Sequence, residues 1–227
     1  HHKYSELIIL YQTKGLHLKA LELLEKQADK PESSLRGIHR TIQYLQHLGK
    51  EHMDLILKFA GWVLEQNPEE GLKIFTEDIQ EVEHLPRPRI LDYLLRQHKL
   101  LVIPYLEHVV NVWNDSNPIF HNALVHQYRE KVQQLSTTSS DDNEGLSLRE
   151  KLLAFLETSS NYTPETVLVL FPYDWLVHTG ESGSRLVHTG VSLCQGWFTL
   201  ESLCVRAGSH WGLSVSGLVH TGVSLGQ

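Results

Sequence analysis

Apolar residues recur at helical spacing from the first residues of the chain. In residues 4–11 they occupy positions i, i+3, i+4 and i+7, which form one face of an α-helix. A second apolar face follows over residues 16–24, and Gly15 between the two can adopt the left-handed conformation that ends many helices. These residues therefore predict a helical hairpin. A single hairpin cannot bury its own apolar stripe, so further hairpins are expected beside it.

The same spacing continues along most of the chain, and Pro- or Gly-containing links interrupt it. Further helices are expected over residues 35–49, 51–65, 69–75, 90–95, 104–113, 118–128, 147–155 and 163–171. The strict alternation of a strand is not evident in these segments. The pattern predicts an all-α fold, an α-solenoid of stacked helical hairpins.

Two segments depart from this pattern and divide the chain. Residues 136–146 are polar and acidic, without periodicity, and we expect a Ser/Thr-rich loop between solenoid segments at 1–135 and 147–174. Thr138 and Ser139 precede acidic residues in this loop, which makes them candidate sites for acidophilic kinases. An inert linker is the alternative interpretation.

The composition changes after residue 174. Residues 175–227 contain no Lys and no Pro, are rich in Gly, Ser, His and Trp, and carry LVHTG repeats. We interpret this tail as irregular, without native structure, and as translated non-coding or repetitive DNA. A short Gly-rich β element is the alternative, because VSL and WFTL have strand-like composition.

Charge and cysteine content narrow the function classes. The 227-residue chain has a formal net charge of −7, which argues against a general nucleic-acid binder. No run of about 18 apolar residues predicts a membrane span. The two cysteines, Cys194 and Cys204, both lie in the tail, so a disulfide framework is not expected in the helical part and a cytoplasmic location is favoured.

The sequence offers only weak evidence for a catalytic or metal-binding site. Fifteen histidines invite a metal hypothesis, but no H-E-x-x-H motif is present, and the pairs His47/His52 and His121/His126 are five residues apart. We expect satisfied or solvated surface histidines, no catalytic residue, no metal site and no cofactor. A metal-dependent hydrolase is the less favoured alternative. The residues expected to matter act through packing in the core; they are Leu7, Tyr11, Leu21, Leu24, Leu45, Trp62, Leu94 and Leu106.

Several long strings resemble one family. KYSELIILYQTKGLH, HRTIQYLQHLG, WVLEQNPEEGLKIFTED, IPYLEHVVNVW and FPYD lie between residues 3 and 174 and are similar to the vacuolar protein sorting-associated protein 39 family. The resemblance implies clathrin heavy-chain-like helical repeats, of the same general kind as TPR repeats, within a subunit of the HOPS tethering complex. It also implies that this chain is an internal segment of a longer protein.

The functional expectations follow from that resemblance. It implies a scaffold and not an enzyme, acting in fusion of late endosomes and autophagosomes with lysosomes or vacuoles. The implied partners are other HOPS and class C tethering subunits, whereas contacts with Rab GTPases and SNAREs would need regions outside this chain. Membrane association would be peripheral and through the complex. The alternative is an adaptor similar to the TGF-beta receptor-associated protein.

Overall fold

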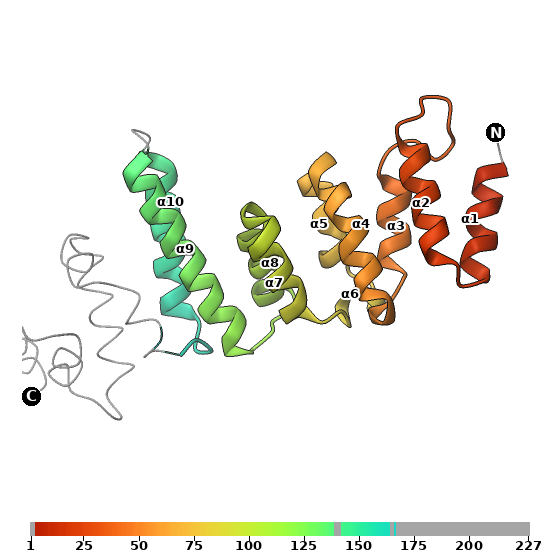
Figure 1. Ribbon diagram of the computed structural model, residues 1–227. Helices are drawn as coiled ribbons and strands as arrows, with labels where there is room; N and C mark the ends of the chain where they lie inside the picture. Colours follow the sequence, from red (N-terminus) through yellow and green to blue (C-terminus); the bar gives the residue numbers. More distant parts are fainter. Residues whose placement is uncertain (1–2, 139–141, 164–165, 167–227) are drawn as a thin grey trace, which may run out of the picture. The chain divides into compact units, whose positions relative to one another are not determined.

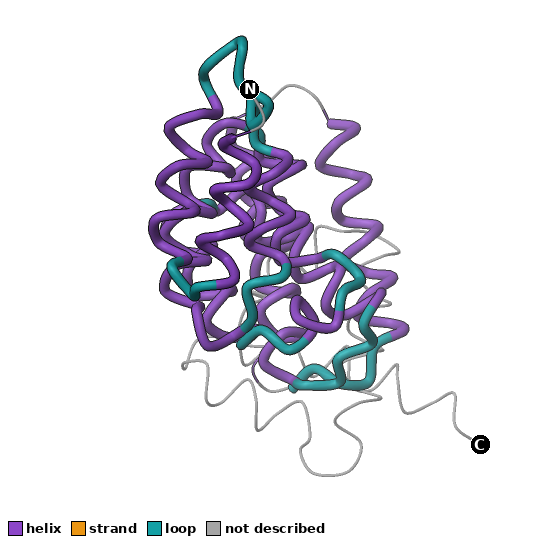
Figure 2. Tube along the Cα trace, turned by 90° about the vertical axis from the view of Figure 1, so that its right-hand side faces the viewer, coloured by secondary structure: helices purple, strands orange, loops and turns teal. Residues whose placement is uncertain are grey.

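The structure, a computed structural model, describes residues 3–138, 142–163 and 166. Every regular element among these residues is a helix, as Figure 2 shows. The chain divides into two compact units: unit 1, His1–Ser116, and unit 2, Asn117–Gln227. The predicted all-α fold with neighbouring helices packed together is confirmed within the described residues. The predicted tail, 175–227, lies outside them.

Unit 1 places its helices side by side in chain order (Figure 1). The elements described in it are α1 (Lys3–Thr13), α2 (His17–Ala28), α3 (His39–Gln46), α4 (Met53–Gln66), α5 (Pro68–Thr76), α6 (Gln80–Glu83), α7 (Arg87–Gln97) and α8 (Val102–Glu107). Short 3₁₀ turns at Lys50–His52 and Lys99–Leu101 precede α4 and α8, and a π-helical turn at His108–Val112 follows α8. The predicted start at Pro104 is therefore two residues late, because proline is tolerated inside the first turn of α8.

The turn between α1 and α2 ends the first helix as the sequence predicts. Gly15 has φ +68°, its N–H donates to the Gln12 carbonyl, and the N–H of Leu16 donates to the Tyr11 carbonyl. This pair of bonds is a Schellman motif, which satisfies carbonyls at the end of α1. An L-residue at position 15 would be strained at this φ, although there is open space around the Cα.

A single residue separates α4 from α5. Asn67 ends α4, and its side chain accepts a hydrogen bond from the Glu70 N–H at the start of α5 (3.1 Å), while Pro68 occupies the first helical position. The two helices then pack so closely that a Cβ added at Gly71 would lie 2.7 Å from Leu64 Cδ2 and 3.2 Å from Leu64 Cα. Gly71 is therefore needed for this approach.

Apolar side chains from several helices fill the core of unit 1. The fully buried members from α4, α5, α7 and α8 include Ile56, Val63, Leu64, Ile74, Phe75, Leu94, Tyr105 and Leu106. Each of these helices is short, and an isolated helix of this length is marginal in water. Mutual burial of these side chains therefore supplies the stability that the separate helices lack.

The described part of unit 2 contains two helices, α9 (Pro118–Thr138) and α10 (Asp142–Thr158), which pack against each other. Lys131 Nζ lies 3.4 Å from Glu144 Oε1 across the pair. The prediction of a loop over residues 136–146 is wrong for the described residues of that range, because both helices continue into it. The buried apolar residues precede this range in α9 and follow it in α10, and cooperative helix formation extends each helix from them into the polar range.

The same pairing overturns the predicted helix start at residue 147. Ser147 lies inside α10, so the S-x-x-E sequence there is not a cap. Glu144, in the first turn of α10, suits the positive end of the helix dipole. The division between units 1 and 2 falls at 116/117, inside the range 1–135 that the sequence analysis treats as one solenoid segment. A helix predicted over 163–171 lies almost wholly outside the described residues.

The close approach at Gly71 generates the first prediction. Gly71→Ala should raise hydrogen exchange in α4 and α5, because the added methyl group meets the buried Leu64 side chain and backbone. Overpacking of this kind costs about 1–3 kcal/mol, which outweighs the gain of about 1 kcal/mol in helix propensity. Hydrogen–deuterium exchange read by mass spectrometry would measure the local effect.

Gly145→Ala in α10 is the matched control. Its added Cβ would meet Leu135 Cβ at 3.9 Å, an ordinary contact, so only the gain in helix propensity should remain and exchange in unit 2 should slow. Unchanged or slower exchange in α4 and α5 of Gly71→Ala would contradict the steric argument.

Candidate functional site

The structure buries most of the residues predicted to act through packing. Leu21, Leu24, Leu45, Leu94 and Leu106 are fully buried in unit 1. The other three, Leu7, Tyr11 and Trp62, are half-buried. Two of these lie on α1, which packs chiefly against α2, and a Trp side chain is large enough that it is rarely covered completely. Substitutions at the five buried leucines are therefore the most direct test of how core packing contributes to stability.

Some histidines contact residues of neighbouring elements in the described part of the chain, as His17 and His121 do. Among the described residues, no three His, Cys, Asp or Glu side chains lie close enough together to hold a metal ion. His121, predicted at the surface, is buried: its Nδ1 lies 2.8 Å from Ser159 Oγ, and its ring stacks on Phe155. The prediction of a surface position was wrong because residue 121 faces α10 within unit 2.

A histidine–tyrosine cluster joins α2 to α3. His17 Nδ1 and the Tyr44 hydroxyl share a hydrogen bond of 2.7 Å, and the His17 ring lies 4.6 Å from that of His52. Burial, followed by the charge of His52, lowers the pKa of His17. Burial raises the pKa of Tyr44, so its hydroxyl stays protonated. The surroundings of His17 therefore favour the neutral ring over the protonated ring.

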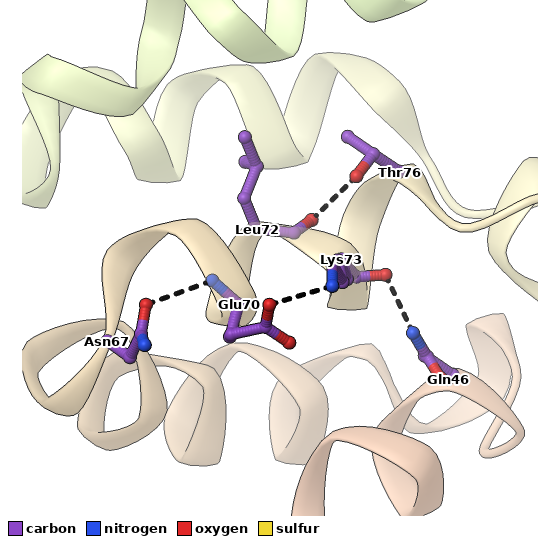
Figure 3. A network of polar contacts seen from close by, with 6 residues as sticks. All are labelled: Gln46, Asn67, Glu70, Leu72, Lys73 and Thr76. Atoms are coloured by element: carbon purple, nitrogen blue, oxygen red, sulfur yellow. Dashed lines mark hydrogen bonds and ion pairs between the residues drawn. The ribbon is translucent and has the colours of Figure 1, made fainter. Parts of the chain in front are cut away.

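A polar network fixes α5 against α3 (Figure 3). The side chain of Gln46, at the end of α3, donates to the Lys73 carbonyl in the last turn of α5 (2.9 Å). Lys73 also pairs with Glu70 one turn earlier, with 2.8 Å between Nζ and Oε1. Gln46 is itself buried, so this bond satisfies its side-chain amide, while the Lys73 carbonyl also accepts the N–H of Glu77.

The last polar cluster of unit 1 surrounds Arg87, the first residue of α7. Its guanidinium lies 2.5 Å from Asp115 Oδ2 and 4.7 Å from the centre of the Trp113 ring. The His108 ring meets Trp113 edge-on, with 4.7 Å between centroids. Burial lowers the pKa of His108, whereas Asp78 and Glu77 oppose that change. A cation–π contact and an ion pair therefore act on the same arginine.

The sequence analysis did not predict these polar contacts, because each of them connects residues that are far apart in the chain. In unit 2, for example, the Asn122 side chain accepts from the Thr163 N–H at 2.8 Å and donates to the Thr163 hydroxyl at 3.2 Å. No local spacing marks such a pair in advance. Of the two candidate phosphorylation sites, Thr138 is the last residue of α9, and Ser139 lies outside the described residues.

Some large apolar side chains remain exposed in the α1–α2 hairpin. They are Tyr4, Ile9, Leu10, Leu16 and Leu18. Apolar residues thus lie on more than one side of α1, and α2 covers only part of them. Within the described residues, none of the helices combines the length and the apolar character that crossing a bilayer requires.

The cluster at His17 generates a pH-dependent prediction. Because the pKa of His17 is lowered below 6.5 in the folded chain, the unfolded chain binds this proton more readily. The contribution of His17 to stability should be full above about pH 6.5 and should fall as the pH drops through that value toward the folded pKa. His17→Gln should weaken this pH dependence, as measured by urea denaturation at neutral and mildly acidic pH.

His47→Gln is the matched control. His47 is exposed, and its ring contacts the Gln43 carbonyl of its own helix at 2.8 Å, so it joins no two helices. This variant should keep the pH dependence of the original chain. Equal pH dependence in His17→Gln and the original chain would contradict the role assigned to His17.

Comparison with known proteins gives the relationships of the chain. A family model described as "Vacuolar sorting protein 39 domain 1" matches residues 1–64. The "Vacuolar protein sorting-associated protein 39 homolog" of Drosophila melanogaster is 52% identical over 180 residues, which are 78% of this chain and 20% of that relative. The human "Vam6/Vps39-like protein" is 49% identical over 190 residues, 78% of this chain and 21% of the relative.

A more distant match separates the two candidate families. The "Transforming growth factor-beta receptor-associated protein 1 homolog" of Danio rerio is 29% identical over 175 residues, 74% of this chain and 20% of its own length. No solved structure matches the chain. The chain spans about a fifth of the length of these curated relatives. Over the residues that match, the chain is a segment of the vacuolar sorting protein 39 family.

Proposed function

We propose that the described helices form an interaction scaffold within a HOPS-type vesicle-tethering subunit. In this role the segment acts by holding partners and not by catalysis. The process is fusion of late endosomes and autophagosomes with lysosomes or vacuoles, and transport of proteins along that route. The observation that carries the proposal is the 52% identity over 180 residues to a relative named for vacuolar protein sorting.

The geometry supports a role in positioning. Neighbouring helices of unit 1 are joined both by shared apolar burial and by polar contacts such as Gln46 to the Lys73 carbonyl. A stack held in this way keeps its outer side chains in fixed relative positions, which is what a binding surface needs. The partners proposed are other HOPS and class C subunits. The location proposed is the cytoplasmic face of late endosomes and lysosomes, by peripheral association through the complex.

An adaptor similar to the receptor-associated protein is the second candidate function. It is supported by the 29% identity to the zebrafish protein, which covers a similar share of this chain. The lower identity favours the tethering subunit. No observation favours the metal-dependent hydrolase, since the part of the chain that the structure describes contains no cluster of metal ligands.

A chimera tests the tethering role. Residues 3–163 of this chain would replace the matching segment of the Drosophila relative in cells that lack that relative. We expect the chimera to co-precipitate the tethering subunits and to restore delivery of endocytosed cargo to lysosomes, because 52% identity preserves the packing and the partner-facing surface. The same segment placed in the receptor-associated protein should function less well.

Two variants of the chimera test whether both readouts depend on the folded core. Leu45→Asp places a charge at a fully buried position and should abolish both readouts, whereas Leu100→Asp, at a side chain 90% exposed, should leave both intact. A soluble, full-length chimera that fails to co-precipitate any tethering subunit would argue against the proposed function.

Phosphorylation within residues 138–139 stays a prediction. Modification of Thr138 or Ser139 would add negative charge between α9 and α10, close in sequence to Asp141 and Asp142. Mass spectrometry of the cellular protein should find the phosphate on one of these two residues. Complete peptide coverage without phosphate would count against it.

A further inference from the structure

Two helices of unit 1 begin at histidines whose rings lie close together. His17 is the first residue of α2, and His52, the last residue of the 3₁₀ turn, is the N-cap of α4. The centres of the two rings are 4.6 Å apart. At these two helix starts, both in the described part of the chain, no side chain caps the backbone N–H groups. Each ring therefore lies at the positive end of a helix dipole.

Tyr44 joins this pair from a third helix, α3. Its hydroxyl lies 2.7 Å from Nδ1 of His17, and its ring meets the His17 ring edge-on, with 6.0 Å between the centres. Burial raises the pKa of Tyr44, so the hydroxyl stays protonated. This hydroxyl can donate to a neutral His17 ring or accept from a protonated one, so the hydrogen bond alone does not select a charge state.

The electrostatic surroundings of His17 oppose a positive charge. A protonated His17 ring would lie beside His52 and at the start of α2. Burial, followed by the charge of His52, lowers the pKa of His17. Water screens the charged side chains of the adjoining elements, because all of them are exposed. They are Lys14, Lys19, Arg40, Lys50, Glu51 and Asp54.

We propose that His17 and His52 act together as a proton-sensitive joint, which holds the α1–α2 hairpin on α3 and α4 while both rings are neutral and loosens that contact when both are protonated. The position of the joint supports this role, because α1 packs chiefly against α2 and α2 packs against α3. Apolar contacts between α2 and α3 persist at low pH. The expected response is therefore more frequent local opening of the hairpin and not unfolding of the unit.

Hydrogen–deuterium exchange of the full chain, measured by mass spectrometry at about pH 7.5 and about pH 5.5, tests this inference, since histidines titrate between these values. Exchange in α1 and α2 would be divided by exchange in α5, which contains no histidine, so that the pH dependence of the chemical exchange rate cancels. The relative exchange of the hairpin should rise as the pH falls, by at most about tenfold per pH unit for each proton taken up.

His52→Gln is the decisive variant, because it removes the second ring charge and leaves the bond between His17 and Tyr44 in place. It should keep its helical signal in circular dichroism and show a weaker pH dependence of hairpin opening than the original chain. His17→Gln combined with His52→Gln should abolish this pH dependence.

His47→Gln is the control for this experiment as well. His47 is exposed and contacts a carbonyl of its own helix, so this variant should keep the full pH dependence. Two results would overturn the proposal. One is a folded His52→Gln chain with the pH dependence of the original chain, and the other is an original chain whose relative exchange is the same at both pH values.

Discussion

Every helix of unit 1 depends on its neighbours to cover its apolar side chains, and the other features of the unit follow from that constraint. The helices are too short to be stable alone, so their buried faces have to meet. Gly71 allows α5 to approach α4, and Asn67 joins the two helices through a single capping residue. Gln46, which the same packing buries, satisfies its side-chain amide by donating to the Lys73 carbonyl.

The sequence predicts those parts of this arrangement that are local. Helical spacing, the glycine at position 15 and the proline at position 68 act within a few residues, so the α1–α2 turn and the α4–α5 junction were both accessible to sequence reasoning. The ends of α9 and α10 were not, because polar residues there show no period and the pairing of the helices decides their extent. His121 was misplaced for the same reason, since its partner Ser159 is 38 residues away.

A stack of helices that is held by contacts between neighbours is locally rigid. The burial at Leu45, Phe75 and Leu94 fixes the helices of unit 1 relative to one another. At the end of that unit, Arg87 of α7 pairs with Asp115 and covers the Trp113 ring. For a scaffold, such contacts present a binding surface of constant shape.

The sequence separation of the polar contacts between helices has a consequence for folding during synthesis. His17 and Tyr44 are 27 residues apart, Gln46 and Lys73 are also 27 apart, and Arg87 and Asp115 are 28 apart. Contacts of such limited sequence separation close small loops and favour fast folding. Each of these contacts can therefore form soon after its second partner leaves the ribosome, without the helices that follow it.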